Sequence, residues 1–129
     1  MLIDWDKMMP TGSLRAGAVR RFATGQQISV VYVETDPQAR FDGRPHRHPH
    51  EQWVVVTAGL LGMTCDDNRF ELSEGEVAFL PANSWHAAVG VGPSGARYLE
   101  FSAPPRLDLL PDSLVPDALE FPREERRDS

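Results

Sequence analysis

Short apolar segments separated by turn residues are the feature that most constrains this chain. Residues 28–34 (ISVVYVE) and 52–57 (QWVVVT) are rich in β-branched and aromatic side chains, which favour strands. The same reasoning predicts further strands at 60–65, 69–72, 76–80, 86–91 and 97–101. Glycine, proline, asparagine and aspartate between these segments predict turns at 58–59, 66–68, 74–75, 81–83 and 92–95. No sustained helical periodicity precedes residue 105, so we expect an all-β sandwich or barrel.

The length of 129 residues predicts one domain with a real core. A hydrophobic content of 41% and a charged content of 25% fit a folded globular chain. We expect the domain to span residues 1–105, including an N-terminal strand extension. Prolines interrupt every element after residue 105, so residues 106–129 are expected to form a proline-rich C-terminal extension with a solvated end.

Charge and composition exclude several classes of partner. A net charge of -6 without a basic run argues against nucleic acid, and no apolar stretch approaches the roughly 20 residues that a membrane span needs. Asp4 and Asp6 stand where a signal peptide would carry basic residues, which predicts a cytoplasmic location. Cys65 is the only cysteine, so a metal site here would use nitrogen and oxygen ligands.

Three of the four histidines lie within the sequence PHRHPHEQ. On a strand, His46 and His48 point to the same face, where they could share a metal, although a polar surface strand would look the same. An extended chain would hold the Cα atoms of His48 and Gln52 about 13 Å apart, so a shared metal requires a turn between them. Pro49 suits such a break. The break also uncouples His50 from the alternation, and we expect His50 to be an exposed loop histidine.

The spacing of these residues resembles the two motifs of the cupin superfamily. In the first motif, His46-x-His48 is followed after three residues by Gln52, at a position where glutamate is usual, and after six more by Gly59. In the second, Gly75 is followed by Pro81 and then by His86. The sequence departs from the motifs at Arg40, Asn83 and Gly90. The resemblance covers residues 28–105 and implies a cupin jelly-roll sandwich or barrel, with one divalent metal held by His46, His48, Gln52 and His86.

This implied ligand set has a chemical consequence. Three neutral imidazoles and a neutral amide oxygen leave the charge of a divalent ion uncompensated, so the ion should be a strong Lewis acid. Such a donor set suits zinc, which we expect first, as well as nickel, iron, manganese or cobalt.

Candidate substrate-binding and catalytic residues lie on or beside the same strands. Aromatic side chains predict a largely apolar pocket for a flat small molecule, and those assigned to it are Trp53, Phe79, Trp85 and Phe101. Glu100 and Tyr32 are the acid or base candidates, and Arg106 follows Pro104-Pro105 where it could close the mouth. Each of these residues would also fit an ordinary place in the core or on the surface.

The resemblance implies a metal-dependent enzyme acting on a carbonyl-containing small molecule. Aromatic polyketide cyclases, which close rings by an aldol reaction, are the first expectation. Uronate ring-opening isomerases of pectin degradation are the second, because the sequence EFSAPPR at 100–106 resembles the end of that family. The resemblance is also compatible with a quercetinase-like dioxygenase, ranked third, and with a non-catalytic ligand-binding cupin.

We also expect a homodimer, because an open sandwich of this size leaves edge strands that a partner can cover. The candidate contact residues are Val19, Phe22, Leu109, Leu110 and Phe121.

The metal prediction can be tested by elemental analysis of protein purified without chelator. We expect one divalent ion per chain, and we expect His48→Ala or His86→Ala to lose most of it because each removes a ligand. His50→Ala is the matched control and should keep most of the metal. Loss of metal from His50→Ala combined with retention in His46→Ala would refute the ligand assignment.

Overall fold

The computed structural model describes residues 1–12 and 15–123 and confirms the all-β architecture. Its strands are β1 (Pro10–Thr11), β2 (Ala18–Thr24), β3 (Ser29–Thr35), β4 (Glu51–Cys65), β5 (Asn68–Ser73), β6 (Val77–Leu80) and β7 (His86–Ala103). Two short 3-10 helices, η1 (Trp5–Lys7) and η2 (Leu107–Leu109), flank them. Within the described residues, no helix has the length and apolar character to cross a membrane.

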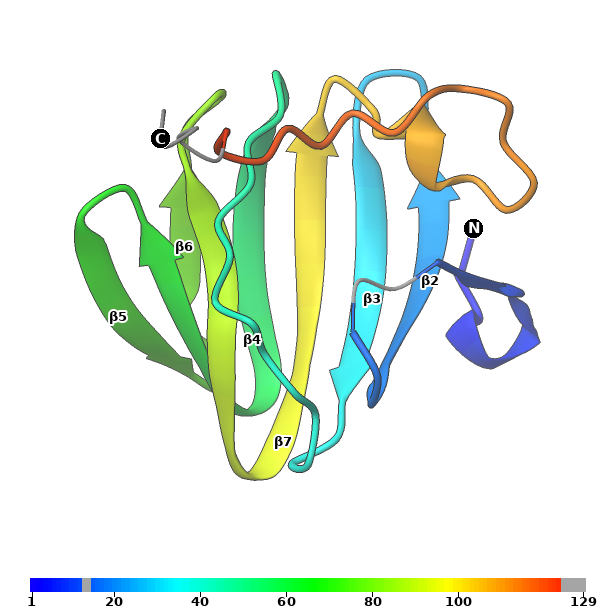
Figure 1. The fold of residues 1–129 in the computed structure, drawn as a ribbon. Coiled ribbons are helices and arrows are strands. Elements are labelled where there is room, and N and C mark those ends of the chain that lie inside the picture. Colours follow the sequence, from blue (N-terminus) through cyan, green and yellow to red (C-terminus); the bar gives the residue numbers. More distant parts are fainter. Residues whose placement is uncertain (13–14, 124–129) are drawn as a thin grey trace.

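All strand pairs are antiparallel, and the order β1-β2-β3-β7-β4-β5 is completed by β6, which pairs with β4. The long strands β4 and β7 pair along nearly their whole lengths: residues 51–59 lie opposite 96–103, and residues 61–65 lie opposite 86–91. Figure 1 shows β7 folding back at the bottom of the molecule, with its lime half and its yellow half running in opposite directions. One bent ladder therefore contributes strands to both walls of the sandwich.

Two of the predicted turns are bends inside strands. Residues 58–59 lie within β4 and residues 92–95 within β7, and the β4–β7 pairing shifts register near both. Gly59 and Gly95 have positive φ angles of 77° and 75°. A Cβ atom on Gly59 would overlap the Gly95 carbonyl oxygen. Glycine thus lets the paired strands bend while the hydrogen-bonded ladder continues. Strand propensity alone does not distinguish such a bend from a turn that ends the strand.

Alternation along the strands separates the core from the surface. In β3, Val31 and Val33 are buried and Tyr32 faces outward, as the period of two requires. The buried apolar side chains form one cluster between the walls, whose members include Phe22, Val31, Val33, Val54, Val56, Leu61, Met63, Leu72, Leu80, Tyr98 and Leu109.

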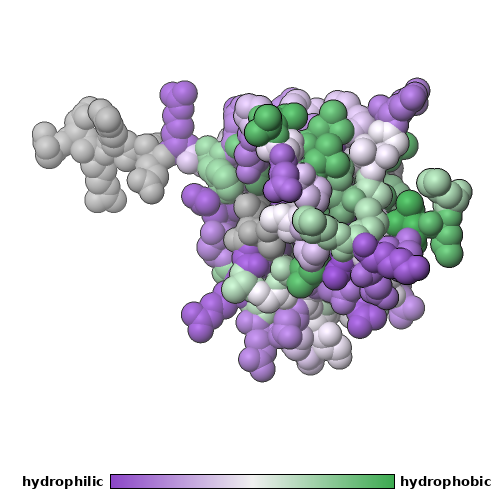
Figure 2. Space-filling model, turned by 90° about the vertical axis from the view of Figure 1, so that its right-hand side faces the viewer, coloured by the Kyte–Doolittle hydropathy of each residue, from purple (hydrophilic) through white to green (hydrophobic). Residues whose placement is uncertain are grey.

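The N-terminal strand and the C-terminal segment both pack on the chain itself. β2 pairs with β3 over seven residue pairs and contributes Phe22 to the core, while η2 contributes Leu109. These two expected dimer contacts are therefore buried inside the chain, whereas Val19 and Leu110 are exposed. Figure 2 views the side where β2 lies and shows separate apolar groups among hydrophilic ones. The homodimer stays a prediction.

The bend at Gly59 gives a stability prediction. Gly59→Ala should lower the free energy of unfolding by about 2–4 kcal/mol, because the new Cβ meets backbone at a positive φ angle. Gly75→Ala is the matched control: Gly75 has a φ angle of +83°, but nothing lies within 4 Å of its Cβ position. That control should lose only about 1 kcal/mol in denaturant unfolding. Equal losses of unfolding free energy in the two variants would show that the structure relieves the overlap with the Gly95 carbonyl oxygen at no cost.

Candidate metal centre

Three histidines from two segments meet beside the start of β4. His46 and His86 form an antiparallel bridge in which each backbone N–H donates to the other's carbonyl oxygen at 2.9 Å. His48 follows two residues after His46, so its side chain lies on the same side of the chain. One nitrogen of each of these three rings lies within 4.8 Å of the others. The structure therefore brings together the three histidines that the motif spacing singled out.

Backbone carbonyls fix the protonation of two of the rings. His48 Nδ1 lies 3.0 Å from the His50 carbonyl oxygen, and His86 Nδ1 lies 3.0 Å from the Ser84 carbonyl oxygen. A carbonyl only accepts, so each Nδ1 carries the proton and each Nε2 presents a lone pair. His86 Nε2 is buried and has no hydrogen-bond partner. A buried lone pair without a donor fits a metal ligand.

Gln52 is buried on β4 with its amide held between two neighbours. Its Nε2 donates to Glu100 Oε2 at 2.9 Å, which leaves Oε1 directed at His48 Nε2 at 3.1 Å. With His48 protonated at Nδ1, two acceptors face each other there, an arrangement that a cation between them stabilises. The donor set of three imidazole nitrogens and one amide oxygen therefore fits a divalent ion.

The histidines are neutral and ready to bind a metal at neutral pH. Burial, together with the neighbouring histidines and Arg106, lowers the pKa of His46 to about 3. Burial and Arg106 lower the pKa of His48 to about 4, and burial also lowers the pKa of His86. Ligation requires the neutral imidazole, so no proton has to leave these rings when a metal binds at pH 7.

The expectation that His50 is an exposed loop residue is wrong. His50 is only 8% exposed, and its ring packs edge-to-face on His48 with 5.2 Å between centroids. Its backbone carbonyl is the acceptor that fixes His48. Residues 49–50 form a bend before β4, as Pro49 suggested, but the bend turns the ring toward His48. His50 lies outside the cluster of three possible ligands.

Glu100 and Arg106 lie with His46, His86 and Gln52 around one small inner cavity of about 50 Å³. Burial raises the pKa of Glu100, while Arg20, Arg106 and Arg15 act in the opposite direction. Arg106 was expected at the mouth but is 5% exposed, because its guanidinium donates twice to Asp108 at 3.0 and 2.7 Å. Two of the three catalytic candidates thus lie next to the candidate ligands.

Tyr32, the third catalytic candidate, lies away from this cavity. Its neighbours Val31 and Val33 point into the core, so its ring points outward and stacks on Trp5 with 5.5 Å between centroids. Tyr32 is therefore not in contact with the metal centre, and strand alternation is the reason.

None of the four aromatic residues expected in the substrate pocket lines the inner cavity or the wider cavity next to it. Trp53 and Phe79 are 45% and 44% exposed, and their rings pack on each other with 4.6 Å between centroids. Trp85 packs under the Arg47 guanidinium. Three of them directly follow or precede a residue of the inner cavity in sequence, so alternation turns them away; these are Trp53 beside Gln52, Trp85 beside His86 and Phe101 beside Glu100.

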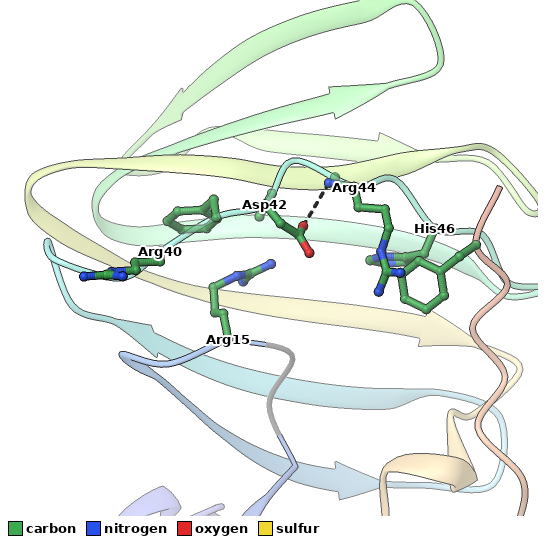
Figure 3. A pocket seen from close by; sticks show the side chains of 9 residues that line it. Arg15, Arg40, Asp42, Arg44 and His46 are labelled. Carbon is green, nitrogen blue, oxygen red and sulfur yellow. Dashed lines mark hydrogen bonds between the residues drawn. The ribbon is translucent and has the colours of Figure 1, made fainter. Parts of the chain in front are cut away.

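Arginines and two other phenylalanines line the pocket in place of the four expected aromatic residues. Outside the inner cavity lies a wider one of about 340 Å³, which we call the vestibule and which is lined by Arg15, Arg40, Phe41, Asp42, Arg44, His46, Ala87, Ala88 and Phe121 (Figure 3). Sequence reasoning missed these arginines. One signal was present: Arg40 stands where the cupin motif has glycine, and this departure lies in the vestibule wall.

The fold and the site together define a small β-sandwich protein with a three-histidine candidate metal centre. A family profile described as the cupin domain matches residues 31–102. The chain belongs to this cupin domain family.

Curated relatives match only part of the chain. Alginate biosynthesis protein AlgA of Pseudomonas aeruginosa is 34% identical over 68 residues, which are 53% of this chain and 14% of that protein. Mannose-1-phosphate guanylyltransferase of Salmonella muenchen is 35% identical over 63 residues, which are 49% of this chain and 13% of that protein. The match spans about a seventh of the length of these relatives.

Solved structures share the fold at lower identity. An RmlC-like cupin from Shewanella frigidimarina has a TM-score of 0.67 at 23% identity, covering 80% of this chain and 89% of that one. The polyketide cyclase RemF from Streptomyces resistomycificus scores 0.67 at 18% identity, with coverages of 80% and 78%. A sugar phosphate isomerase of the cupin superfamily from Silicibacter pomeroyi scores 0.66 at 22% identity, with coverages of 80% and 75%.

The ion pair that holds Arg106 gives a prediction for stability. Asp108→Asn should lower the free energy of unfolding by about 3 kcal/mol at pH 7, because it leaves the buried Arg106 charge without its carboxylate. Asp112→Asn removes the same charge from an exposed position of the same segment and should change little.

The pH dependence supplies a second readout. Burial opposes ionisation of Asp108, but hydrogen bonds from Arg106 and from the Ala118 amide outweigh it and hold the pKa of Asp108 below its ordinary value. The contribution of the pair is therefore complete above the ordinary carboxyl pKa of about 3.9 and declines as the pH falls through the lowered value. Wild type and Asp108→Asn should converge in acid. A constant difference down to pH 2 would contradict this assignment.

Proposed function

We propose that this protein is a metal-dependent enzyme that isomerises a small carbonyl compound by moving a proton between neighbouring carbons. One observation carries the proposal: the Glu100 carboxyl lies beside the candidate ligand Gln52, in the same small cavity as His46 and His86. A potential proton acceptor and a Lewis-acid site therefore open into one space.

The division of roles follows from the residues. His46, His48, His86 and Gln52 would hold the ion. A divalent ion in this site would polarise a carbonyl oxygen and lower the energy of an enolate. Glu100 then accepts the proton from the carbon next to the carbonyl, and the electron pair of that C–H bond becomes the enolate double bond. In an α-hydroxy carbonyl compound, the hydroxyl proton then moves to the former carbonyl oxygen and the carbon that carried the hydroxyl becomes the new carbonyl. Glu100 returns its proton to the former carbonyl carbon, which completes the isomerisation.

The surroundings of Glu100 suit this role. Burial raises the pKa of Glu100 and makes its carboxylate a better base, while Arg20, Arg106 and Arg15 favour the ionised form. Gln52 holds Oε2, which orients the carboxyl group. Leu61, Met63 and Tyr98 form part of the inner cavity wall and limit the water around the reacting carbons.

This arrangement favours an isomerase over the aromatic polyketide cyclase expected first. The cyclase expectation depended on a largely apolar pocket lined by four particular aromatic residues. Those side chains lie outside the lining, and the two phenylalanines that do line the vestibule, Phe41 and Phe121, stand among arginines. A uronate isomerase, the second expectation, acts on an anionic sugar and so requires polar anchors, and the arginines of the vestibule supply such groups. A cupin sugar phosphate isomerase has the same fold, although at 22% identity that likeness concerns the fold alone.

Hydrogen–deuterium exchange tests the proposal without knowledge of the natural substrate. Metal-loaded protein in D₂O should exchange the proton next to the carbonyl in a panel of small keto and aldehyde sugars, followed by proton NMR. Glu100→Gln should lower this exchange by roughly 100-fold or more, because general base catalysis typically contributes that much, while metal content stays unchanged.

Glu71→Gln is the matched control, since it removes one carboxylate from the exposed face of β5 and should leave exchange unchanged. Metal-loaded wild type that exchanges no carbonyl compound would support a non-catalytic binding cupin. Turnover that requires oxygen would move the protein to the dioxygenase class.

A further inference from the structure

The vestibule lies directly outside the candidate metal centre. Its lining shares Arg15, His46 and Ala88 with the inner cavity, so the two spaces adjoin. The inner cavity, at about 50 Å³, is much smaller than the vestibule, at about 340 Å³ on the same measure. A substrate whose reacting end enters the inner cavity therefore extends into the vestibule.

Arg44 is the arginine best placed to contact that remainder. Its guanidinium lies 3.8 Å from the centre of the Phe121 ring, and Figure 3 shows it extending from the loop between Asp42 and His46. Among residues 1–12 and 15–123, no carboxylate forms an ion pair with it. A guanidinium stacked on a ring is held in place while its N–H groups point outward in its own plane. Arg44 is thus an ordered donor facing the vestibule.

A second arginine is held in a similar way from the other side. Arg15 comes from the N-terminal part of the chain, and its guanidinium lies 4.5 Å from the centre of the Phe41 ring. Figure 3 shows it reaching toward Asp42, while Arg40 points to the far end of the pocket. Three arginines and one aspartate line this space in a chain whose net charge is -6. The lining of the vestibule therefore carries a net positive charge, opposite to the net charge of the whole protein, and favours anions.

The C-terminal segment holds the Phe121 ring, on which Arg44 packs, in place. Glu120 and Arg47 exchange backbone hydrogen bonds of 2.9 Å in both directions, and their side chains form an ion pair at 2.9 Å. The Phe121 ring also packs edge-to-face on His46, with 6.0 Å between centroids. The residue that supports Arg44 thus also contacts a candidate metal ligand.

We propose that Arg44 and Arg15 form an oxyanion subsite, which binds the phosphate or carboxylate group of a substrate whose carbonyl end enters the inner cavity. The substrate class is then an anionic sugar or other small anionic carbonyl compound. This assignment to a substrate rests on the proposed function, whereas binding of the anion itself does not. Planar guanidinium groups bind either oxyanion through paired charge-assisted hydrogen bonds.

Calorimetric titration of chelator-treated full-length protein tests the subsite, because phosphate then has no metal to bind. We expect saturable binding of inorganic phosphate, and of acetate in a second titration; the tighter of the two identifies the preferred oxyanion. Arg44→Gln should weaken the preferred anion at least about tenfold, in line with the loss of a charged hydrogen bond. Arg69→Gln, which removes an exposed arginine of β5, is the matched control and should bind as wild type does.

Phe121→Leu tests the contribution of the Phe121 ring separately from that of the Arg44 charge. It keeps Arg44 but removes the ring face, so it should weaken binding by less than Arg44→Gln does, with thermal unfolding used to verify folding. Absence of saturable binding of both anions would overturn the inference, and so would equal losses in Arg44→Gln and Arg69→Gln. Binding without any proton exchange would leave the subsite standing and refute only the isomerase. Exchange at equal rates on neutral and anionic carbonyl compounds would refute the assignment of the subsite to the substrate and leave the isomerase standing.

Discussion

The hydrogen-bonded ladder between β4 and β7 is the constraint on which the site depends. Because both strands bend at glycines and remain paired, one ladder holds the first residue of β7, His86, and also Glu100 near its other end. β4 places Gln52 beside Glu100, and the bridge from His86 to His46 draws in the segment that carries His48. Backbone pairing, rather than side-chain contact, therefore assembles the candidate ligands.

Burial then gives the assembled groups their chemistry. The same apolar surroundings lower the pKa of His46 and His48 and raise the pKa of Glu100, so the histidines stay neutral and the carboxylate becomes more basic. Fixed carbonyls at His50 and Ser84 direct the Nε2 lone pairs inward. A polar network with this many fixed partners costs less to keep buried than the same groups unpaired.

The C-terminal segment connects stability to the site. Arg106 is buried against Asp108, and Asp108 also accepts a hydrogen bond from the Ala118 amide further along the segment. Residues 119–121 then reach the vestibule and inner cavity beside His46. The proline-rich composition of this segment predicts no regular element, and as far as residue 123 it forms only the short helix η2 and one isolated bridge.

The sequence by itself determined the all-β class and the three histidines, because strand propensity and ligand spacing are local properties. It also indicated Glu100 and Arg106. Only the tertiary structure decided what surrounds them. Because neighbouring residues of a strand face opposite sides, Gln52 and Trp53 cannot both point into the pocket. Which of the two faces inward depends on how the sheet packs, and the sequence does not show this. Arg15 and Arg44 are far apart in sequence and meet only because separate segments close over the same cavity. Such long-range meetings leave no periodic trace in the sequence, so the basic vestibule became visible only in the folded chain.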